Sequence, residues 1–343
     1  MVARTVRTDD RPAEAAEPDG APAAWGHRHL LDVDVLARED IVAVLDTAEA
    51  MEEVLQRRVA RTPALRGVTV FNLFYEPSTR TRASFELAGK VLGADVINMT
   101  GSGSSVEKGE SLIDTVATIR AIGADVIVMR HPSGGAPYLA AQHSDAHVVN
   151  AGDGLHAHPT QALLDAFTLR RRLGDLAGKR IVLIGDIKHS RVARSNVWAL
   201  TTLGMEVTLV GPRTLLPTGL NAAPPASGRD LSLPRVRLEE DLDRAIEGAD
   251  AVMALRLQRE RMQGAFLPSL REFSRRYQIT PERMARAREG AAVLHPGPMN
   301  EGVEIAADVA HGMQSEVERQ VAHGVAVRMA VLYLLTQGVG VDR

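Results

Sequence analysis

Residues 68–92 read VTVFNLFYEPSTRTRASFELAGKVL, and this stretch decides the fold class. Its first seven residues are mostly apolar, as expected of a strand that is buried on both faces. Apolar residues then recur at helical spacing from Ser84 to Leu92. A buried strand that leads directly into a helix is the unit from which parallel sheets are built, so the stretch predicts an α/β protein.

The same alternation continues along the rest of the chain. Further apolar runs predict strands at 94–99, 125–130, 148–151, 180–185, 205–210, 250–255 and 291–294. Helical patterns lie at 111–122, 158–173, 191–203 and 315–336. Residues 215–234 are rich in Pro and Gly and predict an irregular loop. The pattern restarts near residue 160, which indicates two α/β halves, each with a parallel sheet flanked by helices.

Composition excludes several classes of protein. The 343 residues include no cysteine, which rules out disulfides, thiolate zinc sites, iron–sulfur clusters and cysteine nucleophiles. With 43 acidic and 40 basic side chains, the formal net charge is -3, so a broad nucleic-acid-binding face is not expected. No run approaches about 18 uninterrupted apolar residues, so we expect no spanning helix and no membrane partner. Residues 1–25 lack a signal-peptide pattern and predict a flexible extension, and we expect a cytoplasmic protein.

The loop after the first strand carries an unusual density of polar groups. In parallel sheets, ligands bind beyond the carboxyl ends of the strands. Here Ser78, Thr79, Arg80 and Thr81 stand at the first turn of a helix, where free N–H groups already favour an anion. Arg80 adds a guanidinium that can grip phosphate oxygens in a bidentate fashion. The alternative is that Ser78 is an ordinary N-cap and that the arginines are solvated.

Other strands of the first half also end in polar residues. The second is followed by the Gly/Ser loop 101–109, in which Ser104 and Lys108 could approach an anion, although flexible surface loops look the same. The third ends in Arg130. The fourth leads to His158 and Gln161 at the start of a helix, where a histidine can serve a site or only the structure. Because no acidic or cysteine cluster accompanies the histidines, we expect no metal.

The second half adds three more loops of this kind. The strand at 180–185 leads to Arg191, and its single glycine excludes a dinucleotide-binding turn. The strand at 250–255 is followed by Arg256 and Gln258, which alternate and therefore share one side of an extended chain. The last strand ends in a proline-framed loop that contains Pro296 and Gly297.

The strand ends together offer a set of cations: Arg80, Arg130, Arg191 and Arg256, with Lys108 available. No Ser–His–Asp relay and no acidic dyad stands out among them. These residues suit the positioning of polyanionic reactants and the stabilisation of negative charge, without a covalent intermediate and without a cofactor.

Seven motifs in this order resemble the catalytic chains of the aspartate/ornithine carbamoyltransferases. They are FYEPSTRTR, SSVEKGES, VMRHP, HPTQALLD, GDIKHSR, LRLQRERM and HPGPMNEGVEI, and the similarity runs from about Leu30 to Leu335. STRTR and HPTQ are common to the whole superfamily. The Lys108 loop, the Arg256–Gln258 pair and the loop of Pro296 favour the aspartate members, since ornithine enzymes typically carry a cysteine in that loop.

The resemblance implies transfer of a carbamoyl group from carbamoyl phosphate to L-aspartate, a step of pyrimidine synthesis. It implies a carbamoyl-phosphate-binding domain at 26–165 plus 314–343, an aspartate-binding domain at 166–313, and a C-terminal helix that returns to the first domain. By similarity, the carbamoyl phosphate site comprises Ser78, Thr79, Arg80, Thr81, Arg130, His158, Gln161, Pro296 and Gly297. Of these, Arg80, Thr81, Arg130 and His158 would be catalytic. Lys108, Arg191, Arg256 and Gln258 would bind aspartate.

The resemblance also implies an assembly, because Ser104 and Lys108 match residues that reach into the neighbouring subunit's site. We expect a homotrimer or a dimer of trimers, with dihydroorotase or regulatory subunits as further partners to consider. The alternatives are a carbamoyltransferase with another acceptor, such as ornithine, and a non-catalytic homologue that scaffolds dihydroorotase. Two positions depart from the family pattern. Gly297 replaces a larger apolar residue, and Glu301 stands where Arg is common.

Overall fold

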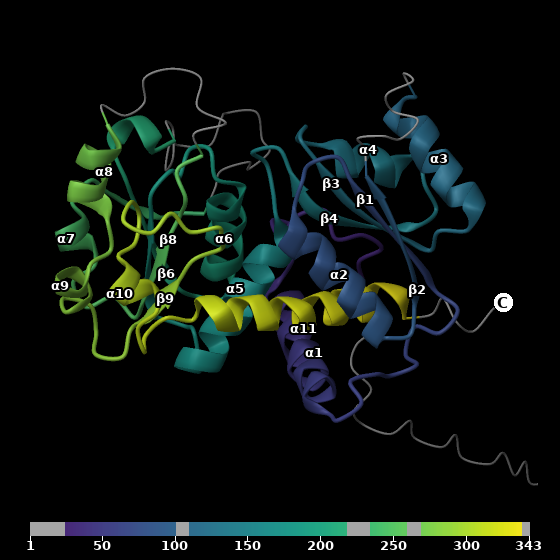
Figure 1. The fold of residues 1–343 in the computed structure, drawn as a ribbon, viewed down its shortest axis with the longest axis horizontal. Helices are drawn as coiled ribbons and strands as arrows, with labels where there is room; N and C mark the ends of the chain where they lie inside the picture. The colour runs from purple at the N-terminus through teal and green to yellow at the C-terminus, as the bar shows by residue number, and fades with distance from the viewer. Residues whose placement is uncertain (1–24, 101–109, 218–233, 259–268, 338–343) are drawn as a thin grey trace, which may run out of the picture.

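The computed structural model describes residues 25–100, 110–217, 234–258 and 269–337. These residues form two sheets, one in each half of the chain, and all of the strand pairs are parallel (Figure 1). The first sheet has the order β2-β1-β3-β4 and the second β7-β6-β5-β8-β9. The strands are β1 (Thr69–Phe74), β2 (Asp95–Thr100), β3 (Val126–His131), β4 (His147–Asp153), β5 (Arg180–Ile184), β6 (Glu206–Val210), β7 (Arg237–Glu239), β8 (Ala251–Ala254) and β9 (Ala292–Leu294).

Helices cover both sheets, which confirms the fold class predicted from the sequence. The long helices are α1 (Arg38–Gln56), α2 (Thr79–Val91), α3 (Leu112–Ile122), α5 (Pro159–Leu173), α6 (Arg191–Thr202) and α11 (Val317–Thr336). The shorter ones are α4 (Ala136–Gln142), α7 (Leu242–Ala245), α8 (Leu270–Tyr277), α9 (Pro281–Met284) and α10 (Ala307–Ala310). The sequence patterns did not predict α1, the short helices or β7. None of the described helices is long and apolar enough to cross a membrane.

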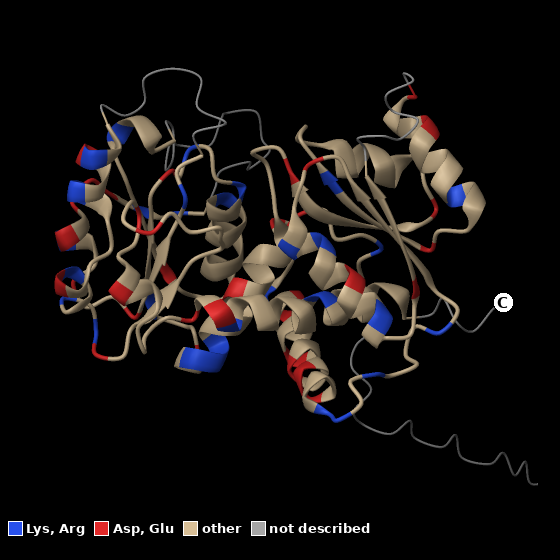
Figure 2. Cartoon of the chain, in the orientation of Figure 1, with Lys and Arg blue, Asp and Glu red and all other residues tan. Residues whose placement is uncertain are grey.

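The C-terminal helix α11 returns to the first half, as expected. It begins beside β9 of the second sheet and runs across the molecule to pack on α1, α2 and α5 (Figure 1). Acidic residues gather on α1 (Figure 2), and Glu49 there pairs with Arg171 of α5 at 2.6 Å. The helices α1, α5 and α11 therefore form a layer that both halves share.

The apolar core of this layer is continuous from one half to the other. It includes Phe167 of α5 and Val327 of α11, and it reaches Val128 in the first sheet and Leu183 in the second, all of them fully buried. Two separate clusters cover the opposite faces of the two sheets. Because the halves share one core, their strand ends are held close together.

The strand orders show where ligands should bind. In the first sheet the chain moves outward from β1 in one direction and from β3 in the other, and β5 and β8 have the same relation in the second sheet. Ligands of open α/β sheets bind at such switch points, beyond the carboxyl ends of the strands. The four arginines predicted from the sequence follow β1, β3, β5 and β8, or end them. The topology thus places all four at the two switch points.

Candidate active site

A cavity of about 630 Å³ is lined by residues from both halves. Every predicted site residue within the described part of the chain lines it: Ser78, Thr79, Arg80, Thr81, Arg130, His158, Gln161, Arg191, Arg256, Gln258, Pro296 and Gly297. Ser104 and Lys108 lie outside the described residues. Residues that are about 220 positions apart in the sequence therefore meet in one cavity.

The first turn of α2 forms the end of the cavity that suits an anion such as phosphate. Ser78 is the N-cap, and its hydroxyl accepts a hydrogen bond from the Thr81 N–H at 3.4 Å. The turn contains no acidic residue, so the helix dipole and the free N–H groups are available to an anion. The cavity wall here combines the buried Thr81 with the exposed Arg80.

Gly297 lies directly against the Arg80 guanidinium. Its φ is +67°, which disfavours other residues, and an added Cβ would collide with that guanidinium. Gly297, one of the two positions that depart from the family pattern, thus leaves room for the Arg80 guanidinium.

Arg130 and Arg191 are held together by one carboxylate, Glu76. Arg130 donates to Glu76 Oε1 at 2.8 Å, and Arg191 donates to Oε1 at 2.9 Å and to Oε2 at 3.0 Å. Both guanidiniums also donate to backbone carbonyls, those of Ala151 and Gly154. Glu76 of the first half therefore orients an arginine from each half of the molecule.

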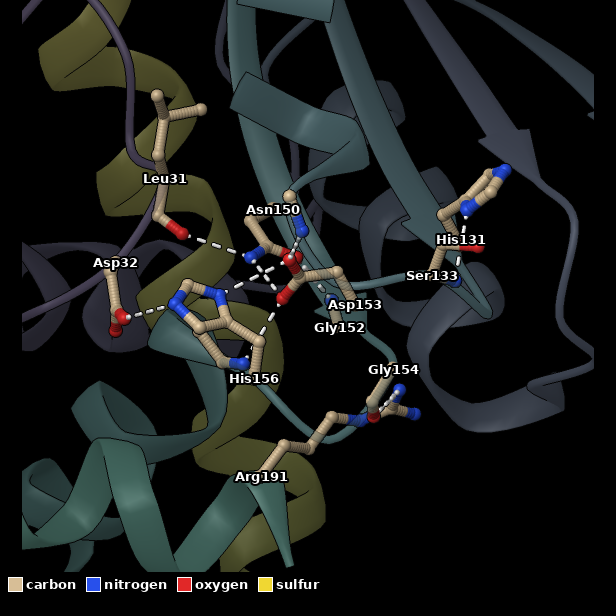
Figure 3. Close-up of polar contacts among 12 residues, drawn as sticks. Leu31, Asp32, His131, Ser133, Asn150, Gly152, Asp153, Gly154, His156 and Arg191 are labelled. Carbon is tan, nitrogen blue, oxygen red and sulfur yellow. Dashed lines mark hydrogen bonds and ion pairs between the residues drawn. The ribbon is translucent and has the colours of Figure 1, made fainter. Parts of the chain in front are cut away.

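The loop after β4 supports this arrangement (Figure 3). The buried Asp153 accepts hydrogen bonds from Asn150 Nδ2, from Ala157 N and from Gly135 N, and it contacts His156 at 3.2 Å. This hydrogen bond raises the pKa of His156 above its usual value. The loop thereby holds Gly154, whose carbonyl oxygen accepts from Arg191.

His158 stands at the N-terminus of α5, directly before Pro159, and is buried. Its backbone N–H donates to Ser195 Oγ at 2.9 Å. Burial, together with the positive charges of Arg191, Arg130 and Arg328, lowers its pKa well below the usual value. The ring is therefore neutral at physiological pH, and a neutral imidazole can donate a hydrogen bond to a developing oxyanion without adding a charge.

Arg256 and Gln258 extend from the end of β8 on the other side of the cavity. Arg256 Nη2 donates to Gln258 Oε1 at 3.3 Å, in agreement with the predicted shared side. The backbone N–H of Gln258 donates to Asp186, whose other oxygen contacts His189 Nδ1 at 2.8 Å. The loops after β5 and β8 are thus joined by a buried carboxylate.

The cavity wall also contains polar residues that sequence reasoning did not single out, among them Glu76, Gln320 and Arg328. Glu76 follows the first strand, and four clustered guanidiniums should have indicated the need for a counterion. Gln320 and Arg328 are buried polar residues on α11, whose C-terminal half is mostly apolar. The available signal was a polar residue within a helical pattern that is otherwise rich in apolar residues, as at Arg328. Among the described residues, no group of three or more His, Asp or Glu side chains could hold a metal ion.

Family models match both halves of the chain. The one described as aspartate/ornithine carbamoyltransferase, carbamoyl-P binding domain, matches residues 28–171. The one described as aspartate/ornithine carbamoyltransferase, Asp/Orn binding domain, matches residues 177–335. Together they span nearly all of the described residues.

Relatives that carry the name aspartate carbamoyltransferase catalytic subunit are similar over most of their length. The one from Roseiflexus sp. is 57% identical over 309 residues, which cover 90% of this chain and 95% of the relative. The one from Sorangium cellulosum is 56% identical over 311 residues, which cover 91% and 94%.

Solved structures share the fold. The aspartate transcarbamoylase of Trypanosoma cruzi in complex with N-(phosphonacetyl)-L-aspartic acid has a TM-score of 0.80 at 31% identity, covering 91% of this chain and 97% of that one. The ornithine carbamoyltransferase of Pyrococcus furiosus has a TM-score of 0.81 at 26% identity, covering 92% and 99%. The fold is therefore common to proteins named for different acceptors.

Proposed function

The chain belongs to the aspartate/ornithine carbamoyltransferase family, and on that premise we propose that its cavity transfers the carbamoyl group of carbamoyl phosphate to the amino group of L-aspartate. The products are N-carbamoyl-L-aspartate and phosphate, and the reaction is a step of pyrimidine synthesis. The observation that carries the proposal is the meeting of an anion-binding helix turn with Arg191, Arg256 and Gln258 in one cavity. The cytoplasmic location remains a prediction.

The first half holds carbamoyl phosphate. Residues 78–81 take the phosphate through hydroxyls, N–H groups and the Arg80 guanidinium. Arg130 bridges the phosphate and carbonyl oxygens, while Thr81 and the neutral His158 donate to the carbonyl oxygen as it gains charge. Gln161 and the carbonyls of Pro296 and Gly297 take the carbamoyl NH2. This assigns carbamoyl-phosphate binding to residues 26–165 plus 314–343, with the carbonyls of Pro296 and Gly297 contributed by the other half.

The second half, residues 166–313, holds the acceptor. Arg191 and Arg256 face the two carboxylates of aspartate, and Gln258 adds a polar contact. The aspartate nitrogen forms a bond to the carbonyl carbon, the bond from that carbon to the phosphate oxygen breaks, and the departing phosphate takes the amine proton. The protein contributes by positioning the two substrates and by stabilising negative charge, with no covalent intermediate on a side chain.

The acceptor can be tested directly. The purified chain is assayed with carbamoyl phosphate and either L-aspartate or L-ornithine, and the carbamoylated product is quantified. We expect turnover with aspartate at least about a hundredfold above that with ornithine, because the two arginines would face an ammonium group in ornithine. Turnover with ornithine alone would favour the ornithine activity, and turnover with neither would favour the non-catalytic homologue.

We assign Ser104 and Lys108 to the site of a neighbouring subunit, which requires a homotrimer or a dimer of trimers. Mixing inactive Lys108→Ala and Arg256→Ala chains tests this assignment. If sites are shared, a reassembled mixed oligomer contains some sites with both native residues, and part of the activity returns. Mixed oligomers without any recovery would contradict shared sites. Mass photometry of the unmixed protein gives the oligomeric state and shows whether other subunits accompany it.

A further inference from the structure

Asp165 is a fully buried carboxylate that lies just behind the cavity wall, one helical turn after Gln161 on α5. Its Oδ1 accepts hydrogen bonds from Gln161 Nε2 at 2.9 Å and from Gln320 Nε2 at 2.7 Å. Its Oδ2 accepts one from Asn196 Nδ2 at 2.8 Å. The donors stand on α5, α11 and α6, so this carboxylate ties together three helices.

A backbone group fixes the direction of these hydrogen bonds. The His295 N–H can only donate, and it donates to Gln320 Oε1 at 2.8 Å. The Gln320 amide must therefore turn its NH2 group toward Asp165. An ionised carboxylate only accepts, so Gln161 also has to present its NH2 group. Gln161 lines the cavity, and the hydrogen bond to Asp165 leaves its oxygen as the acceptor that it can offer there.

The same network anchors the loop that carries Pro296 and Gly297. His295 is held through its N–H, and its Nδ1 accepts from the Gly297 N–H at 2.8 Å. The oxygen of Gln161 and the two loop carbonyls are all hydrogen-bond acceptors. A group with two N–H donors matches such a set, whereas a methyl group would leave acceptors unpaired.

We infer that Asp165 is the positioning residue that sets the orientation of the Gln161 amide and thereby makes the site selective for a carbamoyl NH2 group. The inference rests on the proposed function, because it concerns the carbamoyl end of the same site. Asp165 acts through Gln161 and Gln320 and does not touch the substrate.

The charge state of Asp165 agrees with this role. Burial raises its pKa to about 6, although hydrogen bonds from Asn196, Gln320 and Gln161 and the positive charge of Arg328 oppose the rise. The carboxylate is therefore ionised at neutral pH and accepts from all three amides.

The test compares the binding of carbamoyl phosphate and acetyl phosphate by calorimetry. Acetyl phosphate has the same phosphate and carbonyl groups but a methyl in place of NH2. In Asp165→Ala the Gln161 amide is free to turn, so we expect the Kd of carbamoyl phosphate to rise about tenfold or more, while that of acetyl phosphate changes by less than about twofold.

Asp165→Asn should rescue most of the selectivity. Its oxygen can face the two donors Gln161 and Gln320, while its NH2 group faces Asn196. Within the described structure Asn196 Oδ1 has no hydrogen-bond partner, so that amide can turn to accept, although it then gives up the hydrogen bond from its Nδ2 to Val192 O at 3.1 Å. We expect a Kd for carbamoyl phosphate within about threefold of the wild type.

Thr168→Val is the matched control, since it removes buried hydrogen bonds to Leu164 O and His323 one turn further along α5. It should leave both Kd values unchanged. If Asp165→Ala does not fold, Gln320→Met keeps the carboxylate in place, breaks its link to His295, and should weaken carbamoyl phosphate selectively.

Equal weakening of both ligands would show a merely structural role, and an asparagine variant as impaired as the alanine variant would also overturn the inference. In a Gln161→Ala background, Asp165→Ala should have a smaller effect than in the wild type, and an additive loss would contradict the inference. Because the readout is binding, a wild-type protein that binds carbamoyl phosphate but does not carbamoylate aspartate would contradict the proposed function, while the ratio of Kd values would still decide the role of Asp165.

Discussion

Two carboxylates contact residues of both halves, and they do so in opposite ways. Glu76 stands in the cavity wall with 22% of its side chain exposed, and it pairs with the guanidiniums of Arg130 and Arg191. Asp165 is fully buried and pairs with three neutral amides. The partners of Glu76 are the groups that anionic substrates need, so its contacts can be exchanged for substrate contacts. The partners of Asp165 fix an orientation that does not have to change.

The largest effect is expected where a substrate and Glu76 share a partner. Arg130→Ala should reduce kcat/KM by a factor that corresponds to about 2.7–4 kcal/mol, as for the loss of one oxyanion donor. Steady-state kinetics with both substrates measures the change, and Arg66→Ala, at an exposed position before β1, is the control. Near-normal turnover would mean that Arg130 serves only as a partner of Glu76.

The buried carboxylate should show itself in the pH dependence of stability. The pKa of Asp165 is about 6 in the folded protein, above its ordinary value of 3.8, so the folded state binds the proton more tightly. The stability that this group contributes at low pH is therefore lost as pH rises through about 6. Relative to Asp165→Asn, the free energy of unfolding of the wild type should fall by up to about 3 kcal/mol. Urea unfolding of both proteins from about pH 4 to pH 7 tests this. If the difference in unfolding free energy between the wild type and Asp165→Asn did not change with pH, the pKa of Asp165 would not be raised, and its environment would be more polar than the structure indicates.

The strand-end residues could be predicted from the sequence because parallel strands bring their carboxyl ends to one edge. Apolar runs located Arg130, Arg191 and Arg256 without any knowledge of their partners. The contacts that Glu76 and Asp165 make between the two halves were not predicted, because their partners lie up to 155 positions away in the sequence. Strand patterns do not indicate which helices pack side by side, so they do not place Gln320 of α11 next to Asp165 of α5.

The wall carboxylate should mainly affect the acceptor. In Glu76→Gln the side-chain amide has only one acceptor oxygen, and its NH2 group cannot accept a hydrogen bond from a guanidinium. Arg191 therefore loses a hydrogen bond that orients it. We expect the KM for L-aspartate to rise about tenfold, and that for carbamoyl phosphate to rise less. In the same assay, Asp165→Ala should raise the KM for carbamoyl phosphate more than the KM for L-aspartate. A parallel rise of both KM values in both variants would remove the distinction between the two carboxylates.

The smallest effect is expected at the loop that holds Gly154, the second acceptor for Arg191. The pKa of His156 is raised by its hydrogen bond to Asp153, so the stabilisation is fully present below the ordinary value of 6.5 and is lost as pH rises through the raised value. The ring is 35% exposed, and solvent screening limits the contribution to about 0.5 kcal/mol. His156→Gln should therefore lower the urea midpoint slightly near pH 6 and not near pH 9. The variant could instead raise the KM for L-aspartate as much as Glu76→Gln does. In that case the orientation of Arg191 would depend on the carbonyl of Gly154 rather than on the Glu76 carboxylate.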